Sequence, residues 1–259
     1  MTLEWWNPSN IMMFLLVLTR ISGLFVAAPV LSNQDVPAQV KLGVNIVLSF
    51  IVFSLHMSDP LKTIPRDMIQ FTAMAFQEFL VGAIIGFSVR TLLSGFQMAG
   101  ELISTASGLT VSNIMDPLTQ TNVPVISQFY FFMAMLMFLS LNMHEAMLLA
   151  VNKSYAWFPI GGVIIPMDKI AERIMLMTSN MYVVALMMAM PVFSVILVTE
   201  VALAFTTKVM PQMNIFMVAL PFKIMLALVM LILSLPSTAQ YITDQYDTLQ
   251  QEVMVLMKI

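Results

Sequence analysis

Residues 174–236 are almost continuously apolar, yet several charged residues and prolines lie among them. A charge at the centre of a bilayer costs at least ~2.5 kcal/mol, and proline removes a backbone donor that lipid cannot replace. Such residues are tolerated where they face protein or a water-filled path. The segment therefore predicts helices that pack against other protein as much as against lipid. The residues concerned are Pro191, Glu200, Lys208, Pro211, Pro221 and Lys223.

The composition of the whole chain favours a membrane protein over a soluble one. Hydrophobic residues make up 59% of the 259 residues and charged residues 10%, against roughly 25% charged residues in soluble domains. The net charge of −3 does not indicate a nucleic-acid partner. The chain has no cysteine, which excludes disulfides and thiolate metal sites. The continuous hydrophobic patterning favours a single domain.

Six apolar stretches predict an all-α membrane-type protein with about six to eight long helices, because most stretches reach the ~20 residues that a spanning helix needs. The fifth stretch is too long for one straight span. We expect it either to bend at Pro191 or to extend far out of a bilayer plane. The stretches cover residues 11–31, 42–57, 68–93, 123–151, 174–205 and 215–235.

The third stretch carries Glu78, Gly82, Gly86 and Arg90 at four-residue spacing, which places them on one slowly winding stripe of a helix. Two small residues between two charges form a groove that another backbone can approach closely. Glu78 and Arg90 lie about 12 residues apart, roughly 18 Å along a helix, so they cannot pair with each other. Each needs a partner elsewhere, in this chain or in another.

Residues 108–123 are too polar to span a membrane and too apolar for a typical solvated loop. Irregular backbone at membrane depth survives only when it is buried in protein or lines a water-filled cavity. We interpret this segment as re-entrant or plug-like, with a plain surface loop as the alternative. The candidate plug residues are Gly108, Leu109, Val111, Ile114, Met115, Asp116 and Pro117.

Catalytic and cofactor-binding motifs are absent from the sequence. The two histidines, His56 and His144, do not form a zinc-protease helix. The sequence contains no phosphate-binding loop, dinucleotide fingerprint or nucleophile turn. The 27 methionines suit either a compliant seal around a variable cargo or simple filling between crossed helices. The sequence predicts neither an enzyme nor a cofactor or metal site.

A series of short motifs runs in a specific order along nearly the whole chain. The motifs are RISGLF (20–25), AP (28–29), VP (36–37) with Lys41, Glu78 with Gly82 and Gly86, QMAGE (97–101), Gly108, DP (116–117), Pro191, Glu200, PQMNIF (211–216) and PFK (221–223). No single motif is decisive, but their joint order resembles the FliR/SctT family of type III export apparatus proteins. General likeness favours the flagellar FliR branch over the virulence SctT branch.

This resemblance implies a subunit of the flagellar export gate, present once per complex, that forms a channel with FliP and FliQ. It implies FlhB as a further partner and unfolded flagellar subunits as cargo. It also implies tilted, kinked helices that stand partly out of the bacterial inner membrane, within the flagellar basal body. Residues 1–170 would be FliP-like, with a plug loop at about 106–122, and residues 171–259 would form a FliQ-like hairpin.

The resemblance further implies contacts between helices or subunits at the charges and small residues named above. These residues are Arg20, Glu78, Gly82, Gly86, Arg90, Glu101, Glu200, Lys208 and Lys223. An ion-coupled secondary transporter would also fit broken helices with intramembrane charges, although the two halves of the chain show no internal repeat. A passive scaffold for a membrane complex, without a pore, is a third possibility.

Overall fold

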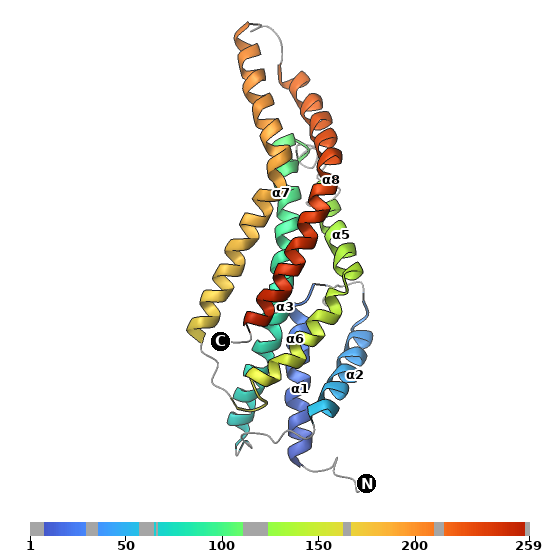
Figure 1. Cartoon of the computed structure of the whole chain (residues 1–259), viewed down its shortest axis with the longest axis vertical. Coiled ribbons are helices and arrows are strands. Elements are labelled where there is room, and N and C mark those ends of the chain that lie inside the picture. Colours follow the sequence, from blue (N-terminus) through green and yellow to red (C-terminus); the bar gives the residue numbers. More distant parts are fainter. Residues whose placement is uncertain are drawn as a thin grey trace. The chain divides into compact units, whose positions relative to one another are not determined.

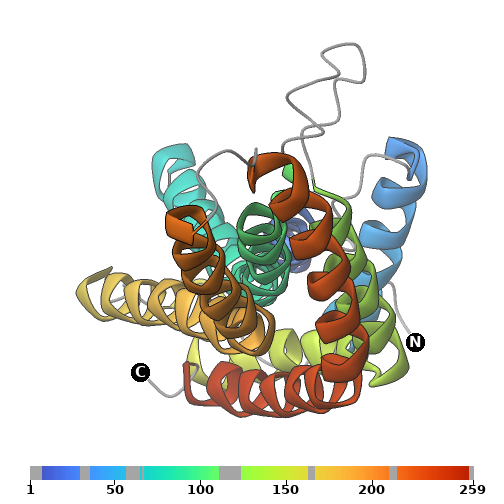
Figure 2. The same ribbon diagram turned by 90° about the horizontal axis from the view of Figure 1, so that it is seen from above.

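All regular elements in the described part of the chain are α-helices, as the coiled ribbons of Figures 1 and 2 show. The computed structural model describes residues 8–29, 36–56, 65, 67–110, 124–162, 167–209 and 215–256. The helices are α1 (Pro8–Ala27), α2 (Ala38–His56), α3 (Met68–Ser107), α5 (Val125–Ser140), α6 (Met143–Trp157), α7 (Met167–Val209) and α8 (Ile215–Leu256). The predicted all-α class is confirmed.

Five of the described helices, α1, α2, α3, α7 and α8, are long and apolar enough to cross a membrane. The pair α5 and α6 counts as a sixth span if the two are taken together. Each of the six apolar stretches in the sequence therefore corresponds to one of these candidate spans. The prediction of a multi-pass membrane-type protein is confirmed.

Two helices extend well beyond the C-terminal ends of their apolar stretches. Helix α3 extends past its apolar stretch to Ser107, just before the turn at Gly108. The hydroxyls of Thr105 and Ser107 donate to carbonyl oxygens of their own helix. Helix α8 continues to Leu256 instead of ending near residue 235. Its polar second half keeps a buried face, to which Ile242 and Tyr246 contribute.

The fourth stretch, residues 123–151, forms two helices with a bend between them and not one straight helix. The chain turns at Leu141 and Asn142, so that α5 ends and α6 begins there. Asn142 has a φ of 53°, in the left-handed region that asparagine tolerates better than most residues. Helix α7, in contrast, runs through Pro191 as one element. Its length of roughly 65 Å is about twice the hydrocarbon core of a bilayer.

The chain folds into two compact units, and α3, α7 and α8 contribute residues to both. Unit 1 consists of Met1–Thr91, Asn142–Leu176 and Asp247–Ile259. Unit 2 consists of Leu92–Leu141 and Met177–Tyr246.

Unit 1 is organised by a close approach of the backbones of α1 and α3. A Cβ atom on Gly82 of α3 would collide with the carbonyl oxygen of Arg20 in α1. A Cβ on Gly86 would lie 2.8 Å from the carbonyl oxygen of Leu24, and one on Gly23 would collide with the carbonyl oxygen of Phe79. The groove that the glycine stripe predicts is thus filled by α1 of the same chain.

Unit 2 uses a similar contact farther along α3. A Cβ on Gly100 would lie 2.7 Å from the carbonyl oxygen of Ile126 in α5. The hydroxyl of Ser127 in α5 donates to the carbonyl oxygen of Gln97 at 2.8 Å. The hydroxyl of Tyr246 in α8 donates to the carbonyl oxygen of Ala134 at 2.8 Å. Hydroxyl-to-backbone bonds therefore connect α5 to both α3 and α8.

The close approach in unit 1 can be tested with a pair of glycine substitutions. We expect Gly82→Ala to destabilise the chain by ~1–3 kcal/mol, because the added methyl group overpacks against backbone atoms. Gly43→Ala in α2 is the matched control, since nothing lies within 4 Å of its Cβ position. Alanine should stabilise that helix by ~0.5–1 kcal/mol. Thermal unfolding of the purified chain in detergent measures both effects, and equal midpoints would contradict the close approach.

Candidate functional site

A buried ion pair in unit 1 joins Arg20 of α1 to Glu78 of α3. The Arg20 Nε atom lies 2.5 Å from Glu78 Oε2, and the two side chains are 1% and 6% exposed. The sequence alone leaves the partner of Glu78 open between this chain and another. In the structure, the partner belongs to the same chain.

The remaining donors of Arg20 reach the end of α6. Its Nη1 atom donates to the hydroxyl of Ser154 at 2.7 Å, and its Nη2 atom donates to the carbonyl oxygen of Phe158 at 2.8 Å. The ring of Tyr155 lies 3.9 Å from the guanidinium carbon, which adds a cation–π contact. A cation at the C-terminal end of a helix is also favoured by the helix dipole. One guanidinium thus joins α1, α3 and α6.

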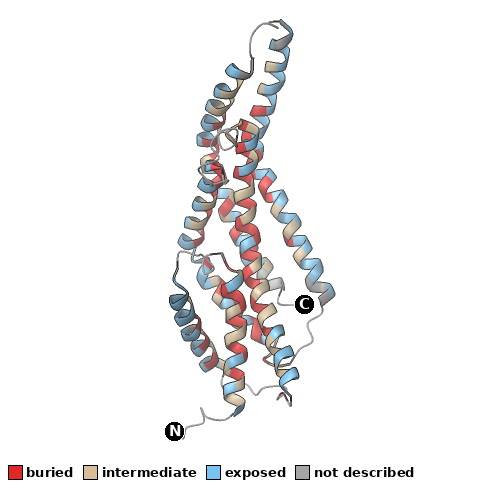
Figure 3. Ribbon diagram, turned by 180° about the vertical axis from the view of Figure 1, so that it is seen from behind, coloured by how far each residue is buried: buried red, intermediate tan, exposed pale blue. Residues whose placement is uncertain are grey.

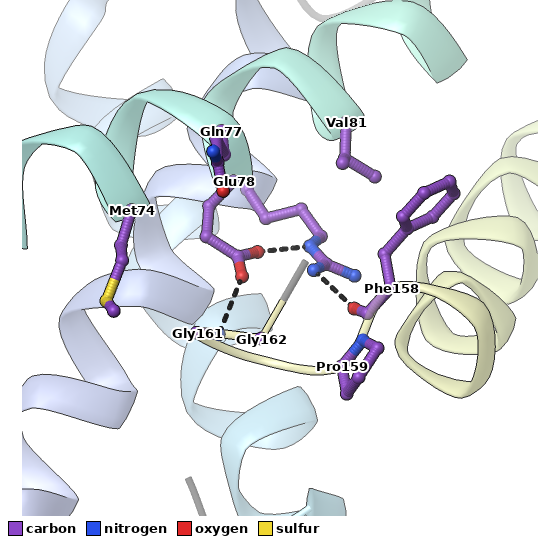
Figure 4. A pocket seen from close by; sticks show the side chains of 9 residues that line it. Met74, Gln77, Glu78, Val81, Phe158, Pro159, Gly161 and Gly162 are labelled. Carbon is purple, nitrogen blue, oxygen red and sulfur yellow. Dashed lines mark hydrogen bonds and ion pairs between the residues drawn. The ribbon is translucent and has the colours of Figure 1, made fainter. Parts of the chain in front are cut away.

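Glu78 makes a second contact with the segment that follows α6. Its Oε1 atom accepts the N–H of Gly161 at 3.4 Å, as Figure 4 shows beside the ion pair. Gly161 has a φ of 72°, a left-handed conformation that suits glycine. The N–H of Phe158 bonds to the carbonyl oxygen of Ser154 at 2.7 Å, which closes the last turn of α6. These bonds hold the turn after α6 against α3.

A small pocket lies beside the ion pair, between α3 and the turn after α6 (Figure 4). Met74, Gln77 and Val81 line it on the α3 side. Its volume of about 10 Å³ is near the lower limit for one water molecule. The described residues also contain no group of three or more side chains that could hold a metal ion. The arrangement therefore fits a structural junction better than a site for a substrate or a metal ion.

Unit 2 contains a different ion pair, between Glu200 of α7 and Lys223 of α8. Lys223 Nζ lies 2.5 Å from Glu200 Oε1. The pair is far less buried than the first one, since the side chains of Glu200 and Lys223 are 53% and 19% exposed. On an ideal helix, Glu200 and Lys208 would lie roughly 12 Å apart along the axis, so a direct pair between them would need a bend. In the structure, Glu200 pairs across the hairpin with Lys223, and Lys208 is exposed.

The other predicted contact residues lie apart from these pairs. Arg90 and Glu101 are both exposed on α3, and the described residues offer neither of them an ion-pair partner. Of the predicted plug residues, Gly108 and Leu109 are described. Gly108 follows α3 with a φ of 82°, and a Cβ there would lie 2.8 Å from the Leu220 side chain. The others, Val111, Ile114, Met115, Asp116 and Pro117, lie outside the described residues.

Sequence reasoning missed the partners that α6 and the turn after it contribute to the Arg20 junction. Ser154 and Tyr155 are not part of a recognisable sequence motif. The contact through Phe158 uses its backbone carbonyl oxygen, which the pattern of side chains does not predict. The run Pro159-Ile-Gly-Gly162 is a turn signal. It indicates where α6 ends, although it does not indicate which helix the turn contacts.

The structural role of the Arg20 junction predicts a strongly non-additive mutant cycle. We expect Arg20→Met or Glu78→Met alone to cost ~3–5 kcal/mol of stability, because each leaves an uncompensated buried charge. The double variant should lose less than the sum of the two. Arg90→Met, at an exposed arginine, should stay within about 0.5 kcal/mol. Denaturant unfolding in detergent measures all four variants, and simple additivity would refute the internal pair.

Comparison with known proteins relates most of the sequence to a family. The model of the family described as "Bacterial export proteins, family 1" matches residues 11–249. The flagellar biosynthetic protein FliR of Bacillus subtilis is 33% identical over 225 residues, which cover 85% of this chain and 84% of the relative. FliR of Escherichia coli is 27% identical over 225 residues (86% and 84%). FliR of Aquifex aeolicus is 30% identical over 217 residues (84% and 83%). The chain therefore belongs to family 1 of the bacterial export proteins, and flagellar FliR proteins are among its relatives.

Proposed function

We propose that this chain is a core subunit of the flagellar type III export gate, where it forms with FliP and FliQ the channel for unfolded flagellar subunits. Family membership supports a role in the flagellar export apparatus. The flagellar name of the relatives supports this branch over the virulence branch. Conduction through such a channel needs no catalytic turnover by the chain itself.

One observation on unit 2 carries the proposal of partner subunits. The half-exposed carboxylate of Glu200 lies on a helical hairpin whose exposed large side chains are mainly apolar. Lipid would cover the apolar faces but not the carboxylate, and water would solvate the carboxylate but not the apolar faces. Another protein subunit can satisfy both kinds of surface.

The apolar surface of this hairpin is extensive. Many of its large apolar side chains in unit 2 are 46% to 75% exposed. On α7 they include Leu186, Met187, Met190, Leu197, Val198, Val201 and Phe205, and on α8 they include Met217, Val218, Phe222, Met225, Leu228, Val229, Ile232 and Leu233. Exposed apolar surface on this scale is typical of a site that contacts another protein or a membrane.

The finer parts of the proposal follow from the family resemblance. Residues 1–170 would take the place of a FliP-like subunit and residues 171–259 that of a FliQ-like hairpin, with one copy of the chain per complex. FlhB would dock on the assembly, within the basal body at the bacterial inner membrane. Gly108 and Leu109 would begin the plug of the channel, and Arg90, Glu101 and Lys208 would contact other subunits or helices. These roles stay predictions.

A substitution at the exposed ion pair tests the proposed assembly. We expect Glu200→Ala to lower the amount of FliP and FliQ that co-purifies by about fivefold or more. A fivefold loss corresponds to roughly 1 kcal/mol of binding free energy. Glu172→Ala is the matched control, because Glu172 is an exposed carboxylate on the same helix without an ion pair in the described structure. Affinity purification of the tagged chain from membranes gives the yields.

The same strains separate the export gate from its alternatives. Loss of hook and filament secretion with unchanged uptake of small solutes would support the gate over a secondary transporter. Equal recovery of FliP and FliQ with Glu200→Ala and Glu172→Ala would count against an intersubunit role for Glu200.

A further inference from the structure

Helix α2 turns Asn45 and Ser49 inward and most of its large apolar residues outward, with Ser54 as an exposed polar residue on the outward side. Asn45 and Ser49 are buried, and the side-chain amide of Asn45 donates to the hydroxyl of Ser22 in α1 at 2.8 Å. The hydroxyl of Ser49 donates to the carbonyl oxygen of Asn45 at 2.6 Å. Phe53 completes the buried stripe, with its ring 5.8 Å from that of Phe14. The polar groups of Asn45 and Ser49 are therefore satisfied on the side that faces the protein.

The outward face of α2 is defined by eight large apolar residues that are 43% to 66% exposed. Figure 3 shows this helix mostly in the colour of exposed residues. At ~100° per residue, the outward residues between positions 46 and 55 cover roughly 180° of the circumference. The residues are Val40, Leu42, Val44, Ile46, Val47, Phe50, Ile51 and Leu55.

The length and charge of this face match the hydrocarbon core of a bilayer. No charged residue lies between Leu42 and Leu55. The 19 residues of α2 span roughly 28 Å at 1.5 Å per residue, close to the ~30 Å of the core. Lys41 and His56 lie near the two ends of the helix, where long or amphipathic polar side chains reach the interface.

We propose that the outward face of α2 binds lipid acyl chains. One packed helix covers a stripe of about 100°, so a face of about 180° is wider than a single helical partner needs. The internal hydrogen bonds of Asn45 and Ser49 keep these polar groups away from hydrocarbon. Between Leu42 and Leu55 this leaves Ser54 as the exposed polar side chain, and a serine hydroxyl in a helix can bond to a carbonyl oxygen of its own helix. The hairpin of α7 and α8 differs in this respect, because it presents the carboxylate of Glu200. The assignment of α2 does not depend on the proposed channel.

The natural absence of cysteine allows a direct test with single spin labels. The full chain, with whatever subunits co-purify in cysteine-free form, is placed in vesicles of phosphatidylethanolamine and phosphatidylglycerol. A nitroxide at Val47→Cys or Ile51→Cys should collide with oxygen several-fold more often than with a water-soluble nickel chelate. Ser49→Cys, on the inward side of the same helix, is the control and should collide rarely with either reagent.

Two outcomes would overturn the assignment. Rare collisions with both reagents at Val47 and Ile51 would mean that protein covers the face, and frequent collisions with nickel would mean that water does. Phe50→Cys and Leu55→Cys repeat the measurement if either first variant does not accumulate. The result is separable from the channel proposal, because failure of FliP and FliQ to co-purify would leave the collision rates at α2 fully interpretable.

Discussion

The buried pair of Arg20 and Glu78 is the constraint on which unit 1 depends. A guanidinium and a carboxylate can be buried only if their charges and hydrogen-bonding groups are matched. The glycines at positions 23, 82 and 86 allow α1 and α3 to approach closely enough for that match. The donors left on Arg20 then fix the end of α6 through Ser154 and Phe158. Close backbone packing, charge pairing and the position of α6 are thus one linked arrangement.

The two ion pairs differ in exposure, and this difference suggests different uses. The pair in unit 1 is enclosed by its own chain, so it contributes to the fold. The pair in unit 2 leaves half of a carboxylate uncovered on an apolar hairpin, so it is suited to a contact with another subunit. Helix α2 has a charge-free outer face and is suited to lipid. Under these proposals, charge placement on otherwise similar apolar helices would distinguish surfaces for the fold, for partners and for the membrane.

Sequence patterns predicted the helical class and the groove on α3 because both depend on local periodicity. The four-residue spacing of Glu78, Gly82 and Gly86 is sufficient to predict a face that another backbone approaches. It could not identify Arg20 as the partner, since that pairing joins positions 58 residues apart. The turn at Asn142 was missed although polar residues interrupt the apolar stretch there, because the sequence around it, FLSLNMHEA (138–146), contains neither glycine nor proline to mark a turn. The extension of α8 was missed because its polar half is held by tertiary burial.

The central claim is that this chain encloses the Arg20–Glu78 pair itself and leaves Glu200 for a neighbouring subunit. A single-particle structure of the chain with its co-purified subunits in lipid nanodiscs tests it most directly. The account predicts that Arg20 and Glu78 remain paired with each other, while the second oxygen of Glu200 meets a donor from another subunit. Pairing of Glu78 with another subunit, or a hairpin of α7 and α8 surrounded by lipid at Glu200, would contradict the account.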